Sequence, residues 1–316
     1  GGKVMELAFV INIIAFIIAS TFRAATPLIF ASLGGVFSER SGVVNIGLEG
    51  IMLFGAFFGM LGSYFTHNPW FGVFLGVLVG GLIALIHAFL SVDLKANQVV
   101  SGVAINLLAT SATAFLLQKV FHTTGQSSSV PKVKDWQIPF LKEIPFLGEA
   151  IGKLNPLVYL AVGLVFLSSY FLFKTTYGLR LRAVGENPEA AETVGISVRK
   201  IRYGSVVVSG FLGGLGGVYL SLGQMDLFRE YMSAGKGFIA LAATIAGKWN
   251  PKGAFLACIL FGFAEAMEGQ FQLLGMNIPK HFLHMLPYVL TILLILGLVG
   301  RSVAPAASGI PYEGRK

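Results

Sequence analysis

The densest polar cluster in the chain is the stretch ERSGVVNIGLEG, residues 39–50, which lies between segments that are almost wholly apolar. Asn45 and Glu49 are four residues apart, a spacing that puts two side chains on one helical face, where both can hydrogen-bond a polar ligand. Three glycines in the stretch disfavour a continuous helix, because each costs about 1 kcal/mol relative to alanine in a helix interior. Such a break lines a ligand site or gate in some membrane proteins. The alternative is an ordinary interhelical loop in which Glu39 and Arg40 form an exposed pair.

Further polar side chains lie inside or at the ends of apolar runs. Asn106 and Thr110 share a helical face, as do Glu265 and Glu268. Carboxylates within a membrane are costly and indicate function by default, although contacts between helices or with the membrane interface explain this pair equally well. Asn97 has helix capping as its alternative role. The candidate pathway residues are Asn45, Glu49, Asn97, Gln98, Asn106, Thr110, Glu265 and Glu268.

The composition indicates that these residues belong to a helical membrane protein. Only 12% of the 316 residues are charged and the mean hydropathy is +0.76, whereas a soluble domain averages about 25% charged residues. The net charge of +8 is better explained by retention of cytoplasmic loops beside a lipid bilayer than by nucleic acid binding. The sequence contains no nucleophile–base pair and no metal-ligand set, so it predicts neither an enzyme nor a bound metal or cofactor.

Apolar runs long enough to cross a bilayer predict an all-α, polytopic fold with about ten transmembrane helices, eight or nine being the alternatives. Residues 7–37, interrupted by Arg23, are interpreted as two short spans rather than as one kinked helix. Residues 1–316 are expected to form a single transmembrane domain. The remaining candidate spans are residues 50–65, 70–92, 97–118, 156–174, 202–222, 233–248, 253–271 and 282–300.

The distribution of lysine and arginine predicts the orientation of the chain. The segment 175–201 is bounded by the densest basic set and is expected in the cytoplasm together with both termini. The segment 119–155 is then external and is expected to contain a short surface element. Within the basic loop, Asn187 suits an N-cap, Pro188 the first helical position and Gly195 a helix end. A helix this short is marginal alone in water, so it docks onto a partner or rests on anionic headgroups.

Three segments carry a resemblance to a known family: GLRLRAVGENPEAAETVGIS, GFLGGLGGVYLS and TIAGKWNPKGAFLACILFG. They resemble permeases of ABC importers in the branched-chain amino acid, ribose and nucleoside group, which implies a type II importer-like fold in the bacterial cytoplasmic membrane. In that family the short cytoplasmic helix fits a groove on the ATP-binding subunit. The resemblance implies three partners: that subunit, a second permease in a heterodimer, and an external substrate-binding lipoprotein. It assigns the ATPase contact to Glu186, Asn187, Pro188, Ala190, Ala191 and Gly195.

Two further segments narrow the resemblance. ERSGVVNIGLEGIMLFGAF and KANQVVSGVAINLLAT are similar to permeases that work with basic-membrane-protein-type lipoproteins and import nucleosides, purine nucleosides being favoured here. Ribose-type sugars and branched-chain amino acids are the alternative substrates within the family. An ion-coupled secondary transporter that uses Glu265 or Glu268 for protons is the alternative mechanism. The chain has no GxxxxGK[ST] sequence, so ATP is expected to be bound and hydrolysed by the partner.

Overall fold

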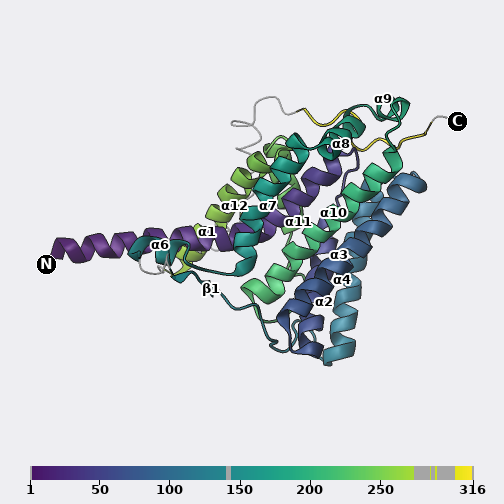
Figure 1. Ribbon diagram of the computed structural model, residues 1–316. Coiled ribbons are helices and arrows are strands. Elements are labelled where there is room, and N and C mark those ends of the chain that lie inside the picture. The colour runs from purple at the N-terminus through teal and green to yellow at the C-terminus, as the bar shows by residue number, and fades with distance from the viewer. Residues whose placement is uncertain (1, 140–143, 274–284, 286–288, 290–302, 315–316) are drawn as a thin grey trace.

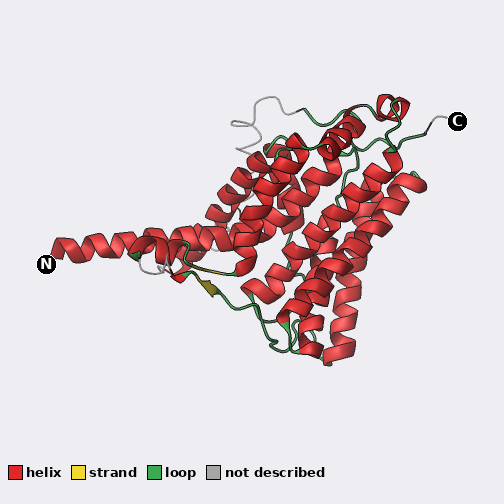
Figure 2. Ribbon diagram, viewed as in Figure 1, coloured by secondary structure: helices red, strands yellow, loops and turns green. Residues whose placement is uncertain are grey.

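The protein is a bundle of long helices with one small two-stranded hairpin (Figures 1 and 2). The computed structural model describes residues 2–139, 144–273, 285, 289 and 303–314. The predicted span 282–300 therefore lies almost entirely outside the described residues. Within those residues, six helices are long and apolar enough to cross a membrane. The predicted helical fold class is confirmed, and the predicted count of about ten spans is not.

The first helix corrects one sequence-based prediction. α1 (Gly2–Arg40) is one helix of 39 residues, so the interpretation of residues 7–37 as two spans is wrong. Figure 1 shows α1 changing direction along its length, and Pro27 lies inside it, where a missing N–H permits a kink without ending the helix. Arg23 does not force a turn, because its Nη2 donates to the Lys153 carbonyl at 3.3 Å. The predicted topology therefore loses one membrane crossing. The cytoplasmic position of both termini was derived from that topology and is not confirmed.

The other membrane-spanning helices correspond to apolar runs of the sequence, and capping residues mark where some of them begin. Asn68 and Asn155 cap two of them, each with a proline at the first helical position, as their sequences favour. α12, of 23 residues, is also long enough to cross, and α11 is a half-length helix. The helices are α2 (Leu48–Thr66), α3 (Pro69–Ala88), continued by η1 (Phe89–Asp93), α4 (Gln98–Phe121), α7 (Pro156–Lys174), α10 (Val198–Val218), continued by η2 (Tyr219–Gln224), α11 (Lys236–Ala246) and α12 (Pro251–Leu273).

Glycines set the closest helix contacts in the bundle. A Cβ atom on Gly214 would lie 2.7 Å from the Gly76 carbonyl oxygen, and one on Gly217 would lie 1.8 Å from the Met52 carbonyl oxygen. α10 therefore packs backbone to backbone against α2 and α3, as small residues permit in membrane helices. The repeated glycine spacing of FLGGLGGVYL is explained by these contacts within the chain.

Loops that were predicted to lie on one side of the membrane gather at one end of the bundle. One end, named the coupling end after the expected ATPase contact, carries α8 (Thr176–Glu186), α9 (Pro188–Thr193) and the tail segment 303–314 (Figure 1). The opposite end carries the hairpin of β1 (Trp136–Gln137) and β2 (Lys153–Leu154), with α6 (Pro145–Ala150). This hairpin and helix form a short surface element within the segment 119–155, as predicted.

Candidate functional site

The polar cluster of the sequence forms a buried break between α1 and α2. Residues 41–47 are not helical, and most of them are buried. Their backbone is satisfied by side chains from other helices: the Val44 N–H donates to Gln98 Oε1 at 2.7 Å, and His87 Nε2 lies 3.0 Å from the Val44 carbonyl. The other ring nitrogen of His87 lies 2.9 Å from Ser101 Oγ. Irregular backbone inside a membrane protein requires such partners, because lipid supplies none.

Asn106 of α4 bonds both the last part of the break and the first turn of α2. Its Oδ1 accepts the Gly50 N–H at 2.8 Å, and its Nδ2 donates to the Ile46 carbonyl at 3.0 Å. Asn45 is fully buried and donates from Nδ2 to Ser209 Oγ of α10 at 3.0 Å. The predicted break is thus present, and three of the predicted polar residues, Gln98 among them, hold it in place.

The alternative of an exposed Glu39–Arg40 pair is wrong. Glu39 is 5% exposed and accepts a hydrogen bond from Trp249 Nε1 at 2.5 Å. Arg40 Nε donates to the Trp249 carbonyl at 2.8 Å. These two bonds attach the end of α1 to the turn between α11 and α12, because a buried polar group needs a hydrogen-bonding partner.

Glu49 has a different place from the one its spacing predicted. Asn45 precedes the helix that starts at Leu48, so the helical spacing does not put the two side chains on one face. Instead, the Glu49 carboxylate accepts the N–H groups of Gly235 at 2.8 Å and Gly237 at 2.7 Å. The charge therefore lies at the positive N-terminal end of α11, a favourable position for a carboxylate.

The remaining candidates divide between this region and other parts of the fold. Glu265 of α12 pairs with Lys236, the first residue of α11, at 2.7 Å, and Glu268 lies half-buried on α12. Asn97 caps α4 by accepting the Val99 N–H at 2.9 Å, which is its alternative role. Among the described residues, the Thr110 hydroxyl bonds within its own helix, to the Asn106 carbonyl. The structure thus gathers one group at the break and a second at the start of α11.

His87 belongs to the break but was not among the predicted pathway residues. In the sequence it is a single histidine in an apolar span, and in the structure both of its ring nitrogens have hydrogen-bonding partners. No local pattern showed that its partner is the broken backbone, since Val44 is 43 residues away in the chain.

The coupling end contains the predicted short helix. Asn187 Oδ1 accepts the Ala190 N–H at 2.9 Å, Pro188 is the first residue of α9, and Gly195 has a φ of +81°, as a glycine after a helix end allows. The prediction of this helix is confirmed. The eleven-residue α8 that precedes it was not predicted.

The residues assigned to the ATPase contact differ in exposure. Ala191 is 3% exposed and packs in the main apolar core, so its side chain faces the protein and not a partner. Pro188 is half-buried, and the other four, Glu186, Asn187, Ala190 and Gly195, are exposed. α9 therefore presents an outward face while its inner side is anchored in the bundle.

The tail segment 303–314 ties the coupling loop to the break. The Ala307 N–H donates to the Gly185 carbonyl at 2.9 Å, and the Gly309 N–H donates to the Gly42 carbonyl at 3.1 Å. Tyr312 donates from its hydroxyl to Glu192 Oε2 of α9 at 2.5 Å. This hydrogen bond, aided by partial burial, raises the pKa of Tyr312 to about 12, so the hydroxyl keeps its proton and its bond at neutral pH.

Comparison with known proteins agrees with this architecture. Residues 17–297 match the family described as branched-chain amino acid transport system / permease component. The chain belongs to this permease family. The permease is 45% identical over 96% of its length to the guanosine ABC transporter permease NupQ of Bacillus subtilis, of which it covers 98%. It is 43% identical over 96% of its length to the nucleoside ABC transporter permease NupC of Lactococcus lactis, of which it also covers 98%.

A more distant relative completes the comparison. The guanosine ABC transporter permease NupP, also of Bacillus subtilis, is 28% identical over 78% of this chain and 72% of its own length. Six helices among the described residues are long and apolar enough to cross a membrane, and with this family membership the permease is a multi-pass membrane protein that serves as a transport component.

Proposed function

We propose that the permease is the membrane subunit of an ATP-driven nucleoside importer, with purine nucleosides favoured, in a bacterial cytoplasmic membrane. The observation that carries this proposal is the near full-length similarity to two permeases named for guanosine and nucleosides. The stretches ERSGVVNIGLEG and KANQVVSGVAINLLAT, which suggested this subgroup, form the two sides of the contact between the break and α4.

The charges around α11 support an uncharged substrate. The N-terminus of a half-length helix inside a membrane is a favourable site for a ligand carboxylate. In this chain Glu49 already accepts two N–H groups there, and the neighbouring ammonium of Lys236 is paired with Glu265. An amino acid substrate would have to displace one of these carboxylates, whereas a nucleoside would not.

The coupling end supports the mechanism of transport. The exposed face of α9 docks on the ATP-binding subunit, which binds and hydrolyses ATP. Closure of that subunit moves α9, and the movement passes to α8 and α10, which flank it, and through the tail to the break at Gly42. A shift of these elements changes the side of the membrane to which the pathway opens. This pathway is positioned by the residues of the break and by those at the N-terminal end of α11.

Two different permeases are proposed to form the working pair. Bacillus subtilis has two permeases named for guanosine, and this chain is 45% identical to NupQ and 28% identical to NupP. Such unequal similarity favours a heterodimer in which this chain takes the NupQ-like position. An external substrate-binding lipoprotein completes the proposed importer.

The test is uptake of labelled guanosine by bacteria that carry or lack the gene, with unlabelled adenosine, ribose and leucine as competitors. We expect uptake to depend on the gene and to be blocked by adenosine alone. Ala190→Arg, on the exposed face of α9, should abolish uptake at unchanged membrane abundance, while Ala190→Ser should not. Loss of ribose or leucine uptake instead would refute the substrate. Normal uptake by Ala190→Arg would favour an ion-coupled carrier.

A further inference from the structure

A lateral groove opens at the coupling end between η1 and α10. Its volume is about 790 Å³, and one of its walls is apolar. Leu85, Ile86 and Phe89 form this wall and are 43%, 50% and 48% exposed. Three large apolar side chains on a membrane-spanning helix would be covered by lipid acyl chains, and a soluble ligand would gain little from them.

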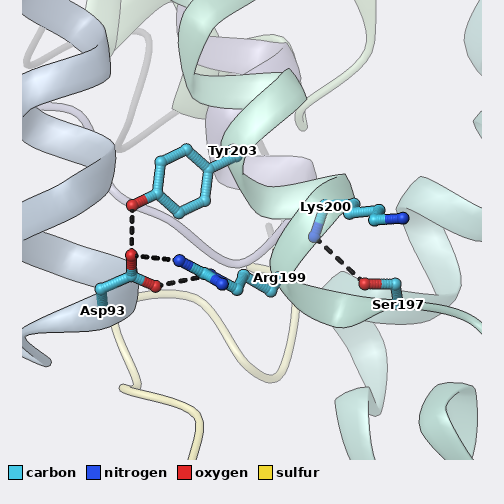
Figure 3. Close-up of polar contacts among 5 residues, drawn as sticks. All are labelled: Asp93, Ser197, Arg199, Lys200 and Tyr203. Carbon is cyan, nitrogen blue, oxygen red and sulfur yellow. Dashed lines mark hydrogen bonds and ion pairs between the residues drawn. The ribbon is translucent and has the colours of Figure 1, made fainter.

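The opposite wall is polar and basic. Arg199 donates from Nε and Nη2 to the two carboxylate oxygens of Asp93, both at 2.7 Å, and the Tyr203 hydroxyl donates to the same carboxylate at 2.7 Å (Figure 3). This bond pattern fixes the guanidinium at the groove. The Lys200 side chain points away from Asp93 in Figure 3, and its exposed ammonium has no ion pair among the described residues.

The charge of the groove and its apolar wall indicate which kind of ligand it binds. The groove is lined by two cations, Arg199 and Lys200, and by one carboxylate, Asp93, so its lining carries an excess positive charge beside an apolar wall. Basic pockets between membrane helices near the cytoplasmic surface suit anionic lipid headgroups. Ser197, which caps α10 with its Oγ, adds a hydroxyl next to the same position.

We propose that the groove between η1 and α10 binds an anionic phospholipid. The phosphate lies at Arg199 and Lys200, and one acyl chain lies along Ile86 and Phe89. Because α10 is the first helix after α9, the bound lipid stabilises the junction between the coupling loop and the membrane-spanning helices. The lipid site does not depend on which substrate the permease carries. A result that refutes the lipid site would therefore leave the nucleoside assignment unchanged.

The test is the melting temperature of the purified permease in detergent, read from tryptophan fluorescence while palmitoyl-oleoyl phosphatidylglycerol is added. Phosphatidylcholine with the same chains and inorganic phosphate are the comparison ligands. Lys200→Gln removes the free charge at the groove. Lys252→Gln removes an equal, exposed charge outside it, at the start of α12.

We expect phosphatidylglycerol to raise the melting temperature of the wild type and of Lys252→Gln with the same midpoint. Loss of one surface lysine contact should move the midpoint of Lys200→Gln to about fivefold higher lipid. Phosphatidylcholine and inorganic phosphate should have little effect. Equal midpoints for the two variants, or equal stabilisation by either comparison ligand, would overturn the proposal.

Discussion

Replacing Asn106 by alanine would leave two backbone groups without partners, one in the α1–α2 break and one in the first turn of α2. The Gly50 N–H loses its acceptor and the Ile46 carbonyl loses its donor. The two groups are four residues apart, as in a helical hydrogen bond, but each bonds Asn106, and Ile46 lies before the start of α2. The break would therefore loosen from α4, the helix that positions it.

The size of the effect follows from the number of groups that lose a partner. A buried donor or acceptor left unsatisfied costs about 1–3 kcal/mol, so two such groups give about 2–6 kcal/mol. Hydrogen bonds between membrane helices average only about 0.6 kcal/mol, since the unfolded chain in lipid finds other partners. One of the two groups, the Ile46 carbonyl, lies outside any helix, so the larger figure applies in part. We expect Asn106→Ala to lower the free energy of unfolding by about 2–4 kcal/mol.

The assay is reversible unfolding of the purified permease in mixed micelles by sodium dodecyl sulfate, followed by circular dichroism. Thr110→Ala is the matched control, because this residue lies one turn along α4 and its hydroxyl bonds only the Asn106 carbonyl of its own helix. Its change should stay within about 0.5 kcal/mol. An Asn106→Ala change as small as that of Thr110→Ala would refute the idea that the side chain holds the break.

Three further perturbations test other parts of the fold. Gly217→Val should prevent stable packing, since even its Cβ atom would meet an α2 carbonyl; loss of monodisperse protein on size exclusion measures this, and Gly163→Ala, with open space around it, should behave as wild type. Glu49→Gln removes the charge at the α11 N-terminus and should cost about 1–2 kcal/mol in the same detergent titration; an unchanged midpoint would contradict this role. Tyr312→Phe should speed proteolysis of the tail. The pKa of Tyr312 is raised from 10.0 to about 12 by its bond to Glu192, so this contribution is complete below pH 10 and is lost as the pH rises through 12; a wild-type tail that loosens by about pH 8 would contradict it.

Short-range signals predicted the local elements well. Asn187, Pro188 and Gly195 specified α9 because a cap, a first-turn proline and a terminal glycine act on neighbouring backbone groups. The glycines of residues 42–50 likewise predicted the break. By contrast, Arg23 suggested a turn inside α1, yet the helix continues because the arginine finds a partner 130 residues away.

Predicted roles failed where a side chain bonds a distant segment. Asn45 and Glu49 were expected to share one face, but each contacts a different helix, α10 for one and the start of α11 for the other. The alternative interpretation placed Glu39 in an exposed pair, whereas it bonds Trp249, 210 positions away. Spacing in sequence states which residues are neighbours on one element and does not state which element lies opposite.

The sequence by itself determined the membrane class, the short helix α9 and the family, because apolar length and capping are properties of consecutive residues. Only the tertiary structure decided that α1 is continuous, that the polar residues of the break bond its backbone, and that the tail joins α9 to Gly42. Inside a membrane protein each buried polar group must find a partner among the groups that packing brings near, and that choice is made by the arrangement of helices.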